Sequence, residues 1–162
     1  MLSIRLVLQV KAIAFPVAGG LGAIFAGWAS DKIFKNRRAP VAFIMLVLLA
    51  ISCYLYRIVP GDNWVISLII LLFIGFFTFG PHVLMVAAIP ADFGSRKAAS
   101  SVTGFIDAMG YLGASLTGVG TGYLIEKFSW DAGFCFWIFG AIFAAIMTLV
   151  IWIYKERAII DN

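Results

Sequence analysis

Polar side chains that could contact a charged solute are rare in this sequence, and one acidic residue lies deep inside an apolar run. Asp107 is the single charge between Ala98 and Ile125. A carboxylate at membrane depth costs ~2.5–3.5 kcal/mol on insertion scales, so it is expected to face a cavity or a protein partner. Spacings of three and four residues place further polar side chains on the same helix face, formed by Ser100, Thr103, Asp107 and Tyr111. We predict that Thr103, Asp107 and Tyr111 line a solute pathway; pairing of Asp107 with a cation elsewhere, or its protonation, is the alternative.

A second candidate group surrounds the single histidine of the chain. His82 follows Gly80-Pro81 and lies one helical turn after Thr78. Histidine titrates near neutral pH, so inside a membrane it is a candidate for substrate or proton binding. Proline frees backbone carbonyls in a helix, and a neutral histidine bonded to one of them is the alternative. We predict that Thr78 and His82 face the same pathway.

No pattern in the sequence predicts catalysis, a metal site or a cofactor. Cys53 and Cys135 lie inside apolar runs without metal-ligand spacing, and we expect them to be buried without a disulfide. A phosphate-binding loop of the Gly-x-x-x-x-Gly-Lys-Ser/Thr type does not occur. We therefore expect no enzyme activity, no metal and no cofactor.

The elements that position these residues follow from composition. Hydrophobic residues form 63% of the 162-residue chain and charged residues 12%, with a mean hydropathy of +1.04. Soluble domains average about 45–50% apolar residues and about 25% charged residues. The apolar excess of this chain therefore argues against a soluble enzyme, a disordered chain or a nucleic-acid-binding module. Five charge-poor runs approach the ~20 residues that cross a bilayer as a helix. They predict an all-α membrane protein with transmembrane helices at about residues 12–30, 39–56, 63–89, 98–125 and 132–154.

The distribution of Lys and Arg predicts the orientation. The first loop, the third loop and the C-terminal tail would lie on one side and hold eight of the twelve cations. The positive-inside bias places that side, with the C-terminus, in the cytoplasm. We expect an N-terminal segment (1–11) that is a truncated loop or the end of a missing helix, a partial transport bundle (12–157) and a cytoplasmic tail (158–162). A bacterial inner membrane is the default location.

A charged motif lies between the first two predicted spans. It begins at Gly27, continues through Asp31 and Lys32, and ends at Arg37-Arg38. A glycine one turn before the aspartate permits close approach of helix ends, and the aspartate can accept a hydrogen bond from a nearby arginine. A positively charged loop with an incidental aspartate is the alternative.

This segment resembles the G-x-x-x-D-[RK]-x-x-[RK]-x-[RK][RK] signature of the major facilitator superfamily, with Phe34 where the family usually has glycine. The resemblance implies that Asp31 and either Arg37 or Arg38 form a cytoplasmic latch. Further segments resemble the organophosphate:phosphate antiporter branch, which includes glycerol-3-phosphate and hexose-6-phosphate transporters. These segments are Phe79-Gly80-Pro81, Arg96-Lys97-Ala98-Ala99, Gly104-Phe105, Gly110-Tyr111-Leu112-Gly113 and Phe128-Ser129-Trp130-Asp131-Ala132-Gly133-Phe134.

The resemblance implies that the five helices correspond to helices 8–12 of a twelve-helix fold. It also implies exchange of a phosphorylated small molecule for inorganic phosphate by alternating access. The expected partners are these solutes, the lipid bilayer and the N-terminal helices of a longer transporter, of which the chain would be a fragment; no nucleic acid is expected. Thr103 and Ile106 replace an Asp-x-x-Lys pair of some hexose-phosphate members, so their sugar specificity is not implied.

Three alternatives remain open at the level of sequence. A sugar-phosphate sensor of the same family would share these motifs without transporting. A carrier of another small solute would share the fold. An inert five-span protein could associate through glycine faces, which we expect between Gly104 and Gly122 and at Gly19, Gly20 and Gly22.

Overall fold

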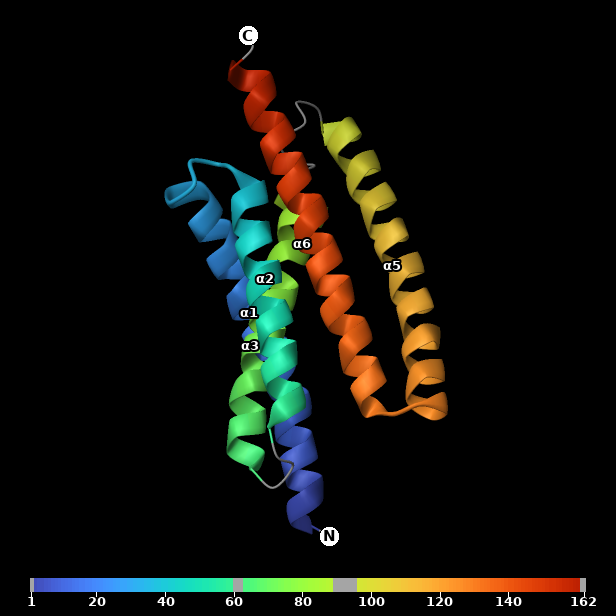
Figure 1. Cartoon of the computed structure of the whole chain (residues 1–162). Helices are drawn as coiled ribbons and strands as arrows, with labels where there is room; N and C mark the ends of the chain where they lie inside the picture. The colour runs from blue at the N-terminus through green and yellow to red at the C-terminus, as the bar shows by residue number, and fades with distance from the viewer. Residues whose placement is uncertain (1, 60–62, 89–95, 161–162) are drawn as a thin grey trace.

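The computed structural model describes residues 2–59, 63–88 and 96–160, with side chains for 7–59, 63–88 and 99–154. These residues form an all-helical bundle in which each long helix runs antiparallel to the next along the chain, so that α1 and α3 are parallel (Figure 1). The elements are α1 (Leu2–Lys32), α2 (Arg38–Ile58), α3 (Trp64–Val83), the π-helical segment η1 (Leu84–Ala88), α5 (Arg96–Lys127) and α6 (Trp130–Ile160). We call the end of the bundle with the α1–α2 turn the α1–α2 end and the opposite end the α5–α6 end.

Helices form at all five predicted positions, and all but α3 extend beyond the predicted spans. α1 begins at Leu2, within the segment predicted to precede the first span, and Arg5 and Lys11 do not interrupt it. α6 continues to Ile160, into the predicted tail. A charged residue ends an apolar run without breaking backbone hydrogen bonds, so a helix can project beyond the hydrocarbon layer. Most of the predicted third loop lies outside the described residues.

Four of the described helices are long and apolar enough to cross a membrane: Val7–Lys32, Arg38–Ile58, Trp64–Ala88 and Trp130–Tyr154. α5 is not among them, although it has 32 residues. Its many glycine, serine and threonine residues, together with Asp107, make it the most polar of the five long helices. The transfer of a helix of this composition from water to lipid is less favourable in free energy than the transfer of the other four.

Glycines bring α1 and α3 into close contact. A Cβ atom added at Gly22 would overlap the backbone carbonyl of Phe76, and one added at Gly75 would lie 2.5 Å from the carbonyl oxygen of Phe15. α1 packs most extensively on α3, and α2 packs on both α6 and α3. The predicted packing role of glycine therefore applies to Gly22 and to Gly19, where a Cβ would lie 2.6 Å from the Phe79 ring, whereas Gly20 faces open space.

The best-buried cluster of the bundle lies at the α1–α2 end. Small residues of α1 and α2 surround Leu84, the first residue of η1, which is fully buried. The buried members are Ala26, Ala29, Val41, Ala42, Met45 and Leu84, with Phe34, Phe76, Phe77 and Ala88 against them. This cluster fixes the ends of α1, α2 and α3 relative to one another.

α5 is the least covered of the helices. Figure 1 shows it beside α6 and apart from α1 and α2, and its described contacts are to α6 and η1. The Trp137 indole N–H donates to the Thr121 hydroxyl at 3.0 Å, which holds the two helices together near the α5–α6 turn. No neighbouring atom would meet a Cβ at Gly104, Gly110, Gly113, Gly118 or Gly122. Within the described residues, the glycine-rich face of α5 therefore has no packing partner.

Candidate functional site

The α1–α2 turn reverses the chain within five residues. Lys35 and Asn36 adopt the left-handed conformation, with φ of 50° and 64°. The Asn36 N–H donates to the Ser30 carbonyl at 2.9 Å and so satisfies one of the free carbonyls at the end of α1. This turn places Arg38, the first residue of α2, beside the last turn of α1.

Arg38 joins the two helices through its guanidinium group. Its Nη1 donates to the Asp31 carboxylate at 2.5 Å and to the Ser30 hydroxyl at 3.1 Å. The Arg38 side chain is 17% exposed and that of Asp31 54%, while Ser30 is fully buried. The structure therefore pairs Asp31 with Arg38, and Ser30 is a further acceptor to which the sequence analysis assigned no role.

The other residues of this motif lie differently. Lys32 and Arg37 are exposed at the α1–α2 end. A Cβ at Gly27 would meet no atom within 4 Å, so the close helix approach expected there is not formed by the described residues. The reason is geometric, because Ala26 and Ala29 face the core while Gly27 points to the surface of α1.

The π-helical segment changes the backbone just after His82. Pro81 lacks an N–H, and the Leu84 N–H lies between the carbonyls of Gly80 and Pro81 as a shared donor. The Thr78 hydroxyl donates to the Ile74 carbonyl at 2.6 Å. Thr78 is half-buried and His82 is exposed. π-helical turns frequently occur at functional sites, and the first residue of this one, Leu84, lies in the buried cluster two residues after His82.

Because α5 is helical, Thr103, Asp107 and Tyr111 lie on one face of it, as their spacing predicts. The described residues show no contact between this face and His82. Thr103 and Asp107 are half-buried, and Tyr111 is 69% exposed. Among the residues that the structure describes, no cation lies within ion-pairing distance of Asp107. α5 contacts η1, the segment that follows His82, so the two candidate groups belong to neighbouring elements without a described contact between them.

A second ion pair lies at the opposite end of the bundle. The Arg57 Nε atom donates to the Asp131 carboxylate at 2.8 Å and joins the end of α2 to the start of α6. Sequence analysis did not identify this pair. Both residues flank apolar runs on the same predicted side, and that signal could have suggested it.

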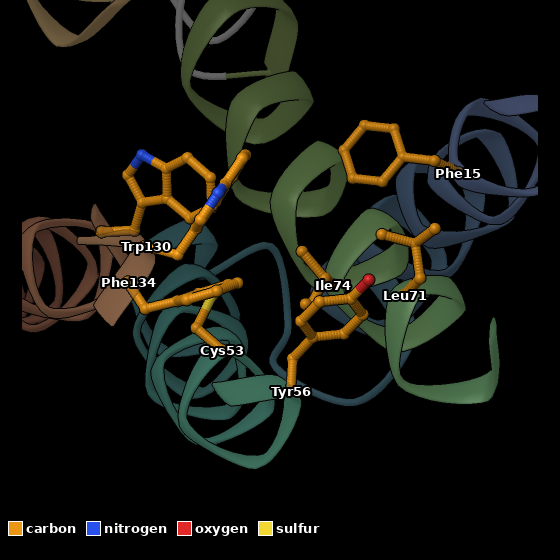
Figure 2. A pocket seen from close by; sticks show the side chains of 8 residues that line it. Phe15, Cys53, Tyr56, Leu71, Ile74, Trp130 and Phe134 are labelled. Carbon is orange, nitrogen blue, oxygen red and sulfur yellow. The ribbon is translucent and has the colours of Figure 1, made fainter. Parts of the chain in front are cut away.

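An aromatic cavity lies between four helices next to this second ion pair. Its volume is about 400 Å³, and Figure 2 shows side chains of α1, α2, α3 and α6 around it. The lining residues are Phe15, Cys53, Tyr56, Leu71, Ile74, Trp130, Phe134 and Trp137. Cys53 is buried as predicted, whereas Cys135 is exposed; both are free thiols. Cys135 differs from the prediction because the outer face of α6 is not covered by another described helix.

Comparison with known proteins assigns the chain to a family by its sequence. The sequence profile of the Major Facilitator Superfamily matches residues 6–159. The glycerol-3-phosphate transporter of Bacillus subtilis (strain 168) is 32% identical over 145 residues, which cover 89% of this chain and 32% of that protein. A probable hexose phosphate transport protein of Chlamydia trachomatis serovar D is 31% identical over 146 residues, or 90% of this chain and 32% of that protein.

A relative with a different described role is also similar. The membrane sensor protein UhpC of Escherichia coli (strain K12) is 34% identical over 120 residues, which cover 74% of this chain and 27% of that protein. The chain thus spans about a third of the length of the curated relatives it matches. No solved structure matches.

Proposed function

Since the chain belongs to the Major Facilitator Superfamily, a family of membrane transporters and not of enzymes, we propose that it forms part of a carrier for phosphorylated small molecules. The similarity to glycerol-3-phosphate and hexose phosphate transporters over about nine-tenths of the chain supports this proposal most directly. We further propose that the carrier exchanges its substrate for inorganic phosphate by alternating access.

In the proposed carrier all five long helices cross the membrane as helices 8–12, including α5. The open glycine and polar faces of α5 support this arrangement, because a polar helix at membrane depth requires protein or a water-filled cavity beside it. The helices of the rest of a longer transporter would supply that cover. We place the α1–α2 end and the C-terminus in the cytoplasm of a bacterial cell.

Within this arrangement the candidate residues have two roles. Asp31 and Arg38 form the cytoplasmic latch, and the contact between them supports that assignment. The pathway residues are those whose polar groups lie on α3 and α5 without being sealed in the core: Thr78, His82, Thr103, Asp107 and Tyr111.

Exchange of labelled phosphate tests the proposed activity. Vesicles that contain the complete gene product are loaded with radioactive phosphate, and external glycerol-3-phosphate or a hexose phosphate is expected to accelerate its release. Asp107→Asn is expected to slow release about tenfold, the effect of removing one contact of ~1.4 kcal/mol. Glu126→Gln, a matched change at an exposed position of the same helix, is the control. Release that no phosphorylated solute accelerates would contradict the transporter proposal.

The similarity to the membrane sensor protein UhpC supports a second candidate function. A sensor would bind a phosphorylated solute without moving it across the membrane. Saturable binding of a radioactive hexose phosphate, combined with no phosphate release in the same vesicles, would favour the sensor. Binding together with exchange would favour the carrier.

A further inference from the structure

The aromatic cavity lies toward the α5–α6 end, and its wall residue Ile74 is one helical turn before Thr78 on α3. Figure 2 shows Trp130 and Phe134 of α6 and Tyr56 of α2 around it, with Ile74 of α3 on the facing side. The Tyr56 and Phe134 rings lie 5.7 Å apart between centroids, so aromatic contacts hold α2 against α6 here. All eight lining residues are aromatic or apolar in type, and a volume of about 400 Å³ lies within the ~300–1,000 Å³ range of ligand sites.

Charged groups border this cavity on the side of the helix ends. Arg57 follows Tyr56, and Asp131 follows Trp130, so two lining residues are direct neighbours of the Arg57–Asp131 ion pair. Both charged side chains remain accessible, at 34% and 65% exposure. Trp130 is itself largely exposed and stands at the first turn of α6, where tryptophan usually marks the membrane–water interface. The site therefore combines an apolar interior with the Arg57–Asp131 ion pair at the depth of the membrane–water interface.

We propose that this cavity binds one phospholipid, with an acyl chain between α1, α2, α3 and α6 and a zwitterionic headgroup at the Arg57–Asp131 pair. The lining fits a hydrocarbon chain, because it offers no ionised group and lies between helices apolar enough to cross a membrane. The rim fits a headgroup that has both signs of charge, since Arg57 can donate to a phosphate and Asp131 can accept from an ammonium group. Binding of a lipid in this cavity does not require transport, although Ile74 of its wall accepts a hydrogen bond from the pathway candidate Thr78.

Brominated lipids provide a direct test, because bromine quenches tryptophan fluorescence on contact. A variant of the chain that retains Trp137 as its only tryptophan reports from the cavity wall, with the other four replaced by phenylalanine. A variant that retains only Trp64, which is 51% exposed at the start of α3, reports on surrounding lipid. Both are titrated in mild detergent with phosphatidylethanolamine brominated on its acyl chains. We expect Trp137 quenching to saturate at an equimolar ratio of lipid to chain, while Trp64 quenching rises gradually.

Two substitutions on α3 provide the matched control. Ile74→Phe places a larger side chain in the cavity, and Ile69→Phe makes the same change at an exposed position of the same helix. We expect Ile74→Phe to remove most of the saturable quenching of Trp137 and Ile69→Phe to leave it unchanged. Replacement of both rim charges by Arg57→Gln and Asp131→Asn is expected to shift saturation to several-fold higher lipid concentration.

Parallel quenching of Trp137 and Trp64, without saturation of either, would overturn the proposal and leave the cavity to water or to another protein segment. Saturable quenching that Ile74→Phe does not alter would also overturn it, since the lipid would then bind elsewhere. An unchanged concentration dependence in the double rim variant would overturn the assignment of the headgroup to the Arg57–Asp131 pair.

Discussion

Ser30 adds a second acceptor to the ion pair between Arg38 and Asp31. Its fully buried hydroxyl accepts from the same Nη1 atom that reaches the carboxylate, so one nitrogen of the guanidinium bridges two acceptors on α1. Arg38 itself is mostly buried, which reduces the screening of the pair by water. The half-exposed Asp31 limits the gain, and exposed pairs of this kind contribute about 0.2–1 kcal/mol.

A double-mutant cycle measures that coupling. Asp31→Asn and Arg38→Gln are each expected to lower the thermal unfolding midpoint of the chain in mild detergent. Their combination is expected to cost about 0.2–1 kcal/mol less than the sum of the single changes, because the second change removes a partner already lost. Strictly additive effects would show that the contact between Asp31 and Arg38 does not stabilise this end of the bundle.

The left-handed backbone of the α1–α2 turn gives a second prediction for a single residue. Lys35 has φ of 50°, where a Cβ atom costs ~1–2 kcal/mol, and glycine avoids that cost at an entropic penalty of ~0.5–1 kcal/mol. We expect Lys35→Gly to stabilise the chain by about 0.5–1 kcal/mol. Lys11→Gly, the same change in the interior of α1, is expected to destabilise it by a similar amount. A loss of stability in Lys35→Gly equal to that in Lys11→Gly would contradict the role of the turn.

Pairs of helices differ sharply in how closely they pack. α1 and α3 meet backbone to backbone through glycine, whereas α5 contacts α6 mainly near the α5–α6 turn. At Gly133 of α6 the nearest neighbour to an added Cβ is the Ile125 side chain at 3.1 Å, which would have to shift by a few tenths of an ångström. The rest of α5 presents glycines without cover from the described residues, while Thr103 and Asp107 of its polar face are half-buried.

Alanine at these glycines tests the difference between buried and open faces. Gly22→Ala is expected to destabilise the α1–α3 pair by about 1–3 kcal/mol, because its Cβ would overlap a backbone carbonyl that cannot rotate away. Gly20→Ala, two residues earlier on the open face, is expected to be neutral or to stabilise the helix by up to ~1 kcal/mol. Thermal unfolding in detergent compares them, and equal effects would show that α1 and α3 do not approach as described.

Across the whole molecule, the sequence predicts the positions of the helices along the chain better than it predicts which helices and side chains contact one another. Apolar runs locate the five helices because the thickness of a bilayer sets their length. The continuation of α1 through Arg5 and Lys11 was not predicted, since charge marks the edge of hydrocarbon and not the end of a helix. The choice of Arg38 over Arg37 depends on the left-handed turn, and the Arg57–Asp131 pair joins residues 74 positions apart. Such contacts depend on tertiary packing and leave no periodic signal in the sequence.

The central claim for the whole molecule is that the polar face of α5 borders the path of a phosphorylated solute. A cysteine placed at Thr103, in a Cys53→Ser and Cys135→Ser background of the complete transporter, would report on this directly. Leu116 is 75% exposed and lies on the opposite side of α5, so Leu116→Cys serves as the control. The rate of labelling by a water-soluble thiol reagent is measured with and without glycerol-3-phosphate or a hexose phosphate.

We predict that a phosphorylated solute slows labelling of Thr103→Cys and leaves that of Leu116→Cys unchanged. Protection at Thr103 that fails with an unphosphorylated sugar would place a phosphate-bearing substrate beside α5. Labelling of Thr103→Cys that no phosphorylated solute alters would contradict the claim that this helix face lines the pathway.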